Sequence, residues 1–358
     1  MINIRLIFTF SGGWPMTETI KTGVLGATGA VGQRFIEALA RHPWFEITAL
    51  AASERSAGKK YRDAANWRLE SQIPEEVADV EVVPVDVGAV DADLVFSALP
   101  ADMAKKVEAD FVKAGCVVAS NAGAFRKEAD VPLMIPEVNP EHLGLIDVQR
   151  DNRGWDGCIV TNPNCTTIMF TLTLKPLMQF GLENVNIASM QAISGAGFDG
   201  IPGMAILENV VPYIGGEEEK VESEPLKLLG EFDGSQIIPA DFNISASCHR
   251  VPVMDGHLEA LWAGMADDPT PDKVRQAFLD FDPGLSDLPT EPEHPIIVRD
   301  EPDRPQPRLD RNAGDGMSVS VGRIREGIRY MVMGHNTIRG AAGASVLNAE
   351  LMHKKGYI

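Results

Sequence analysis

The glycine-rich segment Gly26-Ala-Thr-Gly29-Ala-Val-Gly32 constrains the fold of this 358-residue chain more than any other feature. It lies between an apolar run, Thr22–Leu25, and Val31–Arg41, where apolar residues recur at helical spacing. Glycines at such a turn permit a tight bend and bring the N–H groups of the helix N-terminus close to a phosphate. The spacing, a variant of the dinucleotide fingerprint, predicts a nucleotide-binding βαβ unit. A plain strand-to-helix turn is the alternative.

Strand-like and helical patterns alternate through the rest of the first half. A helix is predicted over Ala101–Ala114, and further strands are predicted at Ile47–Ala52, Val80–Val85, Leu94–Ala98 and Val117–Ser120. Strands that alternate with helices form right-handed crossovers and a parallel sheet. The sequence therefore predicts an α/β fold with a doubly wound, Rossmann-type parallel sheet.

The pattern changes after about residue 183. Strand-like runs occur at Val185–Ser194, Val251–Val253 and Glu259–Met265, and Met317–Arg325 with Ile328–Met333 form a predicted hairpin. The segment Pro283–Arg308, rich in Pro and acids, is expected to be a surface excursion, and Asn336–Lys354 is Gly/Ala-rich and then helical. We therefore expect an inserted α+β domain at 166–333, with a nucleotide domain made of residues 16–165 and 334–358.

Charge and cysteine usage exclude several classes of function. The chain has 32 Lys and Arg against 51 Asp and Glu, and its net charge of −19 disfavours phosphate backbones and anionic membranes. This acid excess fits a salt-adapted surface as well as an ordinary acidic enzyme. The four cysteines show no CxxC spacing, which argues for a reducing, cytoplasmic compartment and against a metal site.

The first 15 residues resemble a signal peptide only weakly, because Arg5 interrupts their apolar stretch. A polar lead-in begins at Met16, directly before the first predicted strand. We therefore expect residues 1–15 to be an upstream extension outside the fold, with Met16 as the true start.

The loop after the second predicted strand indicates which nicotinamide cofactor binds. An NAD site usually has an acid there to hold the ribose 2′-hydroxyl, whereas Ser53, Arg55 and Ser56 suit a 2′-phosphate. The loop therefore favours NADP. Glu54 could instead play the NAD role, and a solvated basic loop is the further alternative.

One cysteine stands at a second strand-to-helix turn. The segment Asn162-Pro-Asn164-Cys165 follows the apolar run at 159–161 and precedes a helical pattern. A thiol at the start of a helix faces the helix dipole and unpaired N–H groups, which lower its pKa and can stabilise an oxyanion. The position predicts a nucleophile, and the alternative is a small buried side chain.

A nucleophilic thiol needs a base that is close in space. His257 is the preferred candidate of the seven histidines, because Gly256 permits a turn before it and a predicted strand after it fixes its position. His249, next to Cys248, is a rival.

Together these segments resemble the aspartate-semialdehyde dehydrogenase family, in particular its archaeal and fungal-type branch. The resemblance extends from about Lys21 to the C-terminus, without Pro283–Arg308. It is carried by GATGAVG (26–32), SNAGAFR (120–126), PEVNPEH (136–142), NPNCTT (162–167), QAISGAG (191–197), GGEEEK (215–220) and RVPVMDGH (250–257).

The resemblance implies roles for individual residues. Cys165 becomes the acyl-accepting nucleophile and His257 the acid/base. The resemblance implies that Arg250 binds the substrate α-carboxylate and that Gln191 lies against the substrate. Glu217 and Lys220 match the residues that contact the amino group and the phosphate, and Arg126 and Asn164 match phosphate-binding positions. Taken without the resemblance, 217–224 is a solvated charge run. The expected cofactor contacts are Gly26, Thr28, Gly29, Ala30, Val31, Gly32, Ser53, Arg55, Ser56, Ser194, Gly195 and Asn336.

The resemblance also implies the reaction. An enzyme of this family reduces L-aspartyl 4-phosphate to L-aspartate 4-semialdehyde with NADPH through a cysteine thioester, needs no metal, and forms a homodimer or homotetramer. An acyl-CoA reductase would use the same cysteine and histidine but has little use for Glu217 and Arg250. N-acetyl-glutamyl-phosphate reductases have NPGC in place of NPNC. A non-enzymatic NADP sensor would have no reason to combine Cys165, His257, Arg250 and Gln191.

Overall fold

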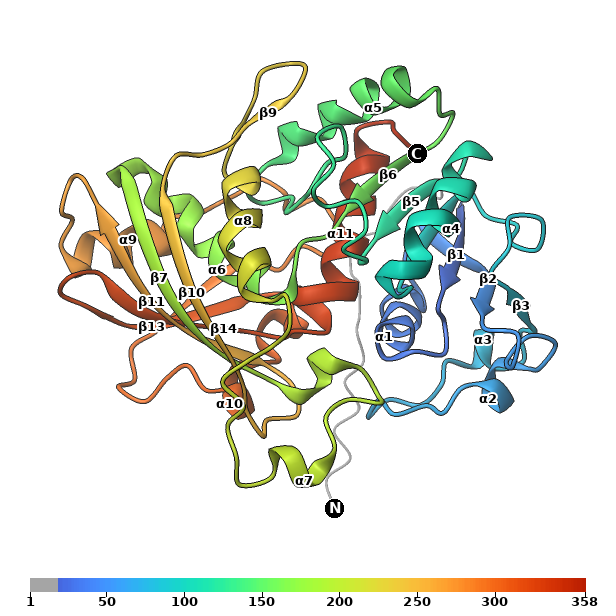
Figure 1. The fold of residues 1–358 in the computed structure, drawn as a ribbon, viewed down its shortest axis with the longest axis horizontal. Helices are drawn as coiled ribbons and strands as arrows, with labels where there is room; N and C mark the ends of the chain where they lie inside the picture. The colour runs from blue at the N-terminus through green and yellow to red at the C-terminus, as the bar shows by residue number, and fades with distance from the viewer. Residues whose placement is uncertain (1–18) are drawn as a thin grey trace.

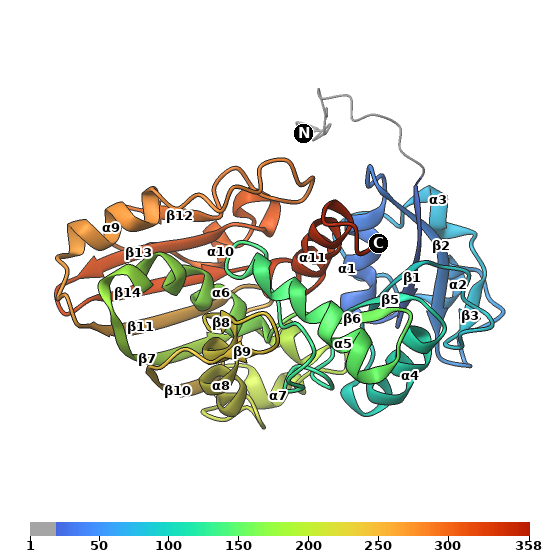
Figure 2. The same cartoon turned by 90° about the horizontal axis from the view of Figure 1, so that it is seen from above.

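The computed structural model describes residues 19–358 as two six-stranded sheets with helices packed against them (Figures 1 and 2). The expectations for residues 1–15 and for Met16 as the start lie outside the described residues. In the described part of the chain, no helix is both long and apolar enough to cross a membrane.

The first sheet is parallel throughout, in the order β3-β2-β1-β4-β5-β6. This is the strand order of a dinucleotide-binding Rossmann sheet, as the sequence predicted. Its strands are β1 (Ile20–Leu25), β2 (Phe45–Ala52), β3 (Val82–Pro84), β4 (Leu94–Ser97), β5 (Val117–Ser120) and β6 (Cys158–Thr161). The helices of this region are α1 (Ala30–Leu39), α2 (Tyr61–Ala64), α3 (Glu75–Ala78), α4 (Ala101–Lys113), η1 (Pro140–Gly144) and α5 (Leu145–Arg153).

Two glycines of the β1–α1 turn have no room for a side chain. Gly26 has φ +80°, and a Cβ there would lie 2.9 Å from the carbonyl oxygen of Ala98. A Cβ on Gly32 would lie 2.2 Å from the carbonyl oxygen of Gly26. The turn therefore needs glycine at the bend and where α1 approaches β1, as a dinucleotide-binding turn does.

The second sheet is mixed, in the order β10-β7-β11-β14-β13-β12. The pairs β10–β7 and β12–β13 are parallel, and the others are antiparallel. Its strands are β7 (Leu182–Gln191), β10 (Asn243–Arg250), β11 (His257–Met265), β12 (Ile296–Arg299), β13 (Val319–Arg325) and β14 (Arg329–Gly334), and a separate hairpin consists of β8 (Glu231–Phe232) and β9 (Ile237–Ile238). The predicted hairpin of β13 and β14 is confirmed.

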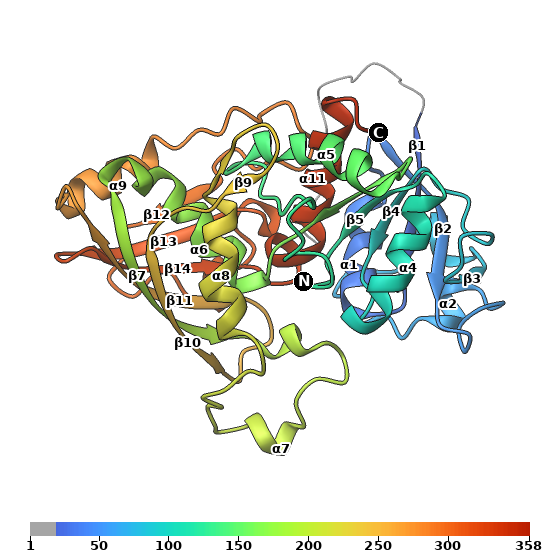
Figure 3. The ribbon, with the colours of Figure 1, turned by 45° about the horizontal axis from the view of Figure 1, so that its top comes forward.

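The helices of this second region pack against the mixed sheet or join its strands. They are α6 (Cys165–Leu174), η2 (Lys175–Phe180), η3 (Ile193–Ala196), α7 (Gly203–Ile206), α8 (Glu218–Leu228), α9 (Pro271–Leu279), α10 (Pro307–Asp310) and η4 (Ala313–Gly316). Figure 3 shows that α7 stands away from both sheets. The chain then returns through η5 (Ile338–Ala342) to α11 (Gly343–Lys354), which packs against α1 and β5.

Two predictions about the second region are wrong. The predicted strand Val251–Val253 is not a strand, because β10 ends at Arg250. The segment Pro283–Arg308 is more than a surface excursion, because it contains β12. Leu285 and Leu288 within it are also buried in the core that includes residues of the first sheet and α11.

Candidate active site

Cys165 lies at the end of the first sheet, where β6 leads into α6. Asn164 caps α6: its side-chain Oδ1 accepts the backbone N–H groups of Thr166 and Thr167 at 2.9 and 3.1 Å. The sequence correctly placed Cys165 at a helix start, but these two N–H groups are not unpaired as expected. Because they already bond to Asn164, an oxyanion at Cys165 needs other donors.

His257 is the histidine that meets the cysteine. Its Nε2 lies 3.3 Å from Sγ of Cys165, and the backbone N–H of Ala192 donates to Nδ1 at 3.0 Å. A neutral ring whose Nδ1 accepts a hydrogen bond carries its own proton on Nε2, and that N–H then points at the sulfur. The rival His249 contacts Ser189 O and lies on the opposite face of the sheet from Cys248 and Arg250.

Burial controls the protonation of this pair. It raises the pKa of the Cys165 thiol to about 12, with Glu217 adding to the rise, while Arg126 and Arg250 oppose it. Burial also lowers the pKa of His257 to about 3, helped by Arg250. The helix start does lower the pKa of the thiol, through the backbone N–H of Thr166. The pKa is nevertheless raised overall, because loss of solvation outweighs this hydrogen bond and the nearby positive charges. The pair rests as a neutral thiol and a neutral imidazole.

The raised thiol pKa predicts slow alkylation of the free enzyme. A raised pKa leaves little thiolate at pH 7, and the thiolate fraction grows as the pH rises. The alkylation rate of Cys165 should therefore climb about tenfold per pH unit between pH 7 and 10. Iodoacetamide labelling, followed by mass spectrometry of the Cys165 peptide, measures this rate. A plateau already below pH 8 would show a preformed thiolate and contradict the account.

Gln191, Arg250 and His257 converge because of strand direction. Gln191 ends β7 and Arg250 ends the parallel neighbour β10, directly opposite it, whereas His257 begins the antiparallel β11 on the other side of β7. All three are buried. Arg250 donates from Nη1 to the carbonyl of Ala192 at 2.7 Å, and its buried Nε has no partner among residues 19–358. A buried guanidinium in that condition is suited to an anion from outside the chain.

Three of the remaining predicted substrate residues are joined to one another, and Arg126 has other partners. The amide Nδ2 of Asn164 donates to Glu217 at 2.9 Å, and Nζ of Lys220 lies 3.5 Å from the same carboxylate. Arg126 follows β5 and donates from Nη2 to the carbonyl of Asn121 at 2.8 Å. Glu217 is buried at the start of α8, so it does not belong to a solvated charge run.

The predicted cofactor residues of the first sheet lie on neighbouring turns. The β1–α1 turn holds Gly26, Thr28, Gly29, Ala30, Val31 and Gly32, and no side chain among residues 19–358 caps α1 at Gly29. The turn touches the end of β2, because the N–H of Gly26 donates to Ala51 O at 2.8 Å. Ser53, Arg55 and Ser56 follow β2 directly, and the first two are exposed. An uncapped helix N-terminus beside hydroxyls and a cation fits a phosphorylated dinucleotide.

The other predicted cofactor residues lie beside the catalytic pair. Asn336 donates from Nδ2 to Ser194 Oγ at 2.8 Å and accepts the N–H of Gly256 at the same distance, which joins three separate loops. A Cβ on Gly195 would lie 2.9 Å from Nη1 of Arg250. Glycine at 195 therefore leaves room at the guanidinium.

Sequence reasoning missed several residues of this site. A Cβ on Gly340 would lie 2.8 Å from Cβ of Cys165, so glycine lets η5 approach the thiol. Ala192 selects the tautomer of His257 through its N–H, which no side-chain pattern reveals. Glu224, in the segment considered a charge run, contacts Arg126 at 3.1 Å.

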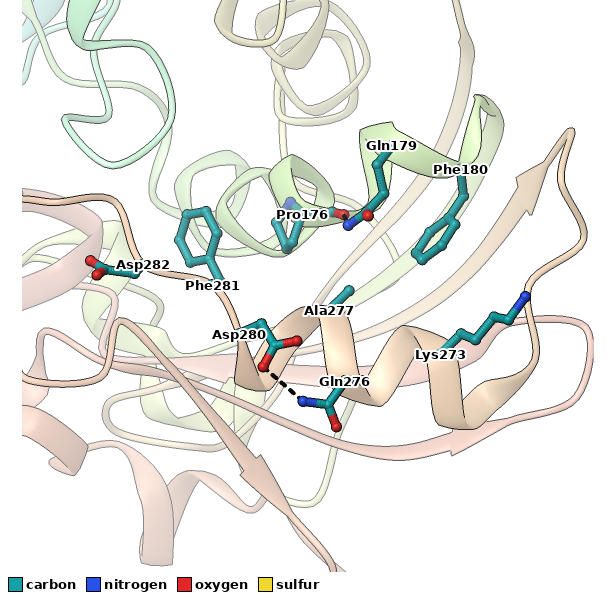
Figure 4. A pocket seen from close by; sticks show the side chains of 9 residues that line it. All are labelled: Pro176, Gln179, Phe180, Lys273, Gln276, Ala277, Asp280, Phe281 and Asp282. Atoms are coloured by element: carbon teal, nitrogen blue, oxygen red, sulfur yellow. Dashed lines mark hydrogen bonds between the residues drawn. The ribbon is translucent and has the colours of Figure 1, made fainter.

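A surface hollow lies apart from these residues, between η2 and α9 (Figure 4). Its lining includes Gln179, Lys273 and Asp280 but none of the predicted site residues.

The fold and the site together define a class of protein: a two-sheet dehydrogenase with a nicotinamide-dinucleotide domain. Residues 21–146 match the family model described as semialdehyde dehydrogenase, NAD binding domain, and residues 174–339 match semialdehyde dehydrogenase, dimerisation domain. The chain is 62% identical over 340 residues to the aspartate-semialdehyde dehydrogenase of Archaeoglobus fulgidus, which covers 94% of this chain and 98% of that protein. It is 46% identical over 361 residues to the Candida albicans enzyme, covering 94% of this chain and 99% of that protein.

Solved structures of aspartate-semialdehyde dehydrogenases have the same fold as this chain. The crystal structure of aspartate-semialdehyde dehydrogenase with NADP from Candida albicans matches with a TM-score of 0.86 and 44% identity, over 95% of this chain and 100% of that chain. The crystal structure of aspartate-semialdehyde dehydrogenase II from Vibrio cholerae, in complex with ASA, matches with a TM-score of 0.75 and 27% identity. The match covers 95% of this chain and 100% of that chain. The chain belongs to the aspartate-semialdehyde dehydrogenase family.

Proposed function

We propose that this protein catalyses the NADPH-dependent reduction of L-aspartyl 4-phosphate to L-aspartate 4-semialdehyde and phosphate. This is the step of its family that leads to lysine, through diaminopimelate, and to threonine and methionine. The observation that carries the proposal is the 3.3 Å contact between Cys165 and His257 beside Arg250, a buried cation whose Nε has no partner in the described part of the chain. A thiol, an imidazole and an anion receptor are the groups that acyl transfer from an amino-acid phosphate requires.

In the proposed first step, Sγ of Cys165 attacks the acyl carbon, the bond from that carbon to the phosphate oxygen breaks, and the thiol proton passes through His257 to the departing phosphate. Nε2 can accept that proton only after the ring proton has moved to Nδ1, which requires the Ala192 contact to open. In the second step the thioester carbon has gained a hydride, the C–S bond of the reduced adduct breaks, and the sulfur leaves as a thiolate. The resting tautomer, restored when the Ala192 contact forms again, suits this step because Nε2–H donates to the departing thiolate.

Arg250 is proposed to bind the substrate α-carboxylate and Glu217 its amino group, with Gln191 against the substrate. Arg126, Lys220 and Asn164 are proposed to bind the phosphate, and the positive charges of Arg126 and Lys220 favour its binding within a chain of net charge −19. The α-carboxylate and amino group distinguish this substrate from an acyl-CoA thioester, which would offer no substrate group to Arg250 and Glu217.

NADP is the cofactor that the predicted residues fit. The phosphates are proposed to lie on the uncapped N-terminus of α1 at Gly26, Gly29 and Gly32, and the 2′-phosphate beside Ser53, Arg55 and Ser56. Ser194, Gly195 and Asn336 are proposed to hold the nicotinamide end. When bound, NADPH supplies the hydride for the thioester carbon.

The 2′-phosphate assignment predicts the effect of Arg55→Ala. Because Arg55 is exposed, its loss should remove one partly screened charge contact, raising the Michaelis constant for NADP about tenfold and leaving that for NAD nearly unchanged. Initial rates with both cofactors measure the ratio. Equal increases for the two cofactors would place the 2′-phosphate elsewhere.

We propose a homodimer or homotetramer assembled through the second sheet. One face of β7, β10 and β11 carries no Asp, Glu, Lys or Arg, although 23% of the chain is charged. Exposed and half-buried residues on this face include Asn186, Ala188, Met190, Ser245, Ser247 and Trp262. An uncharged sheet face is typical of a subunit interface. Sedimentation equilibrium distinguishes dimer from tetramer, and a monomer would contradict the proposal.

We also propose that the nucleotide domain comprises residues 16–165 and 334–358 and that residues 166–333 form the catalytic and dimerisation domain. The contacts of α11 with α1 and β5 support the first grouping. Limited proteolysis tests these boundaries, and cleavage that separated 334–358 from the nucleotide domain would contradict them.

The four free cysteines support a reducing, cytoplasmic location, which fractionation can test.

The experiment that tests the function is the oxidative assay. Aspartate semialdehyde, NADP and inorganic phosphate should together yield NADPH, and omitting phosphate should abolish steady turnover. Performing it at low and at molar salt also tests the salt-adapted surface. Turnover with acyl-CoA substrates alone would contradict the proposal.

A further inference from the structure

The proposed reaction leaves Glu224 without a role, although it lies within the site. Glu224 is in α8, two turns after Glu217, and is 5% exposed. One of its carboxylate oxygens accepts Nη1 of Arg126 at 3.1 Å, and the other accepts the backbone N–H of Asn164 at 2.7 Å. A single carboxylate therefore joins the loop that carries Arg126 to the turn that carries Cys165.

The arrangement fixes the guanidinium of Arg126 at two points. Nη1 bonds to Glu224 and Nη2 to the carbonyl of Asn121 at 2.8 Å. A guanidinium has five N–H groups, so three remain, including a buried Nε without a partner in the described structure. Two fixed contacts prevent the planar group from turning, and the remaining donors keep a set direction. The charge of Arg126 also acts at the thiol, where it opposes the rise in the pKa of Cys165.

The same helix fixes the backbone of this loop. One turn after Glu224, Nζ of Lys227 donates to the carbonyls of Arg126, Glu128 and Val131 at 3.0, 2.8 and 2.8 Å. These three acceptors use all three N–H groups of an ammonium. Helix α8, yellow in Figure 3, thus fixes both the main chain and the side chain of Arg126 from the second region of the chain.

We propose that Glu224 is a positioning residue for the phosphate part of the site. Its carboxylate orients Arg126 and holds the backbone of Asn164, so that phosphate meets a guanidinium already in place. A preorganised receptor binds more tightly, because little freedom is lost when the ligand arrives. The inference rests on the proposed function, in which Arg126 binds phosphate.

The test is Glu224→Gln in the full-length enzyme, assayed in the oxidative direction. The amide keeps the shape, but it has one acceptor for two donors and lacks the charge. Losing a charge-assisted hydrogen bond should raise the Michaelis constant for phosphate about tenfold and leave that for NADP unchanged. Glu224→Asp keeps the charge with a shorter reach and should give an intermediate value. Glu219→Gln, at an exposed position of the same helix, is the matched control and should behave as wild type.

The outcomes separate this inference from the proposed function. Without phosphate-dependent NADPH formation by the wild type, both fail. With an active wild type, an unchanged Michaelis constant for phosphate in Glu224→Gln overturns this inference alone. If Glu224→Gln lowers the melting temperature and kcat but leaves the Michaelis constant for phosphate unchanged, Glu224 has a purely structural role. That result also overturns the inference. If Glu224→Gln does not fold, the same criterion applies to Glu224→Asp.

Discussion

Replacing Cys165 with alanine should abolish turnover, with kcat reduced by at least about 10⁴-fold, because it removes the sulfur on which the thioester is proposed to form beside His257. The change removes one sulfur from a half-buried position and leaves the β1–α1 turn untouched, so NADPH binding should persist. Steady-state rates give kcat, and fluorescence titration with NADPH gives the affinity.

Cys116→Ala is the matched control for this change. Cys116 is also a free, half-buried cysteine, but it contacts Ala92 O, away from His257. This control should retain wild-type activity. Comparable turnover in Cys165→Ala and the control would contradict the assignment of the nucleophile.

Arg250→Lys should give the second-largest loss. The lysine keeps a positive charge but cannot form the planar, two-point contact that a guanidinium makes with a carboxylate, and it also gives up the bond to Ala192 O. We expect kcat/KM for aspartate semialdehyde to fall about 100-fold or more, mostly through KM.

The exposed Arg308→Lys serves as the control for Arg250→Lys and should leave both constants unchanged. A second readout is the affinity for NADPH, which should stay the same in both variants. A fall in kcat for Arg250→Lys at an unchanged KM would mean that Arg250 does not bind the substrate in the ground state.

The parts of the fold that the sequence predicted are those with strong local signals. Gly26 and Gly32 marked the dinucleotide turn because no other residue fits there. β10 was missed because its exposed face presents Asn243, Ser245 and Ser247, which read as a polar loop, although their neighbours pack inward. Its partner β7 supplies the pairing, which is a long-range contact that no window of sequence contains.

The structure brings the predicted pair Cys165 and His257 into contact, while the roles of the site residues stay predictions. The electrostatics of the pair could not be predicted from the sequence. Asn164 directly before a helix is a strong N-cap signal, and it could have shown that the first N–H groups are taken. The raised pKa of Cys165 depends on burial, which arises from packing of segments such as η5 at Gly340, far away in the sequence. Glu224 was hidden because a charge run looks the same whether it faces solvent or a guanidinium.

The most direct test of the thioester mechanism is mass spectrometry of the enzyme mixed with aspartate semialdehyde and NADP in the absence of phosphate. Without phosphate the acyl group has no acceptor other than water, so about one NADPH per active site should form in a burst. An acyl adduct should then appear on the Cys165 peptide and disappear when phosphate is added. A burst without an adduct, or an adduct on another residue, would contradict the mechanism.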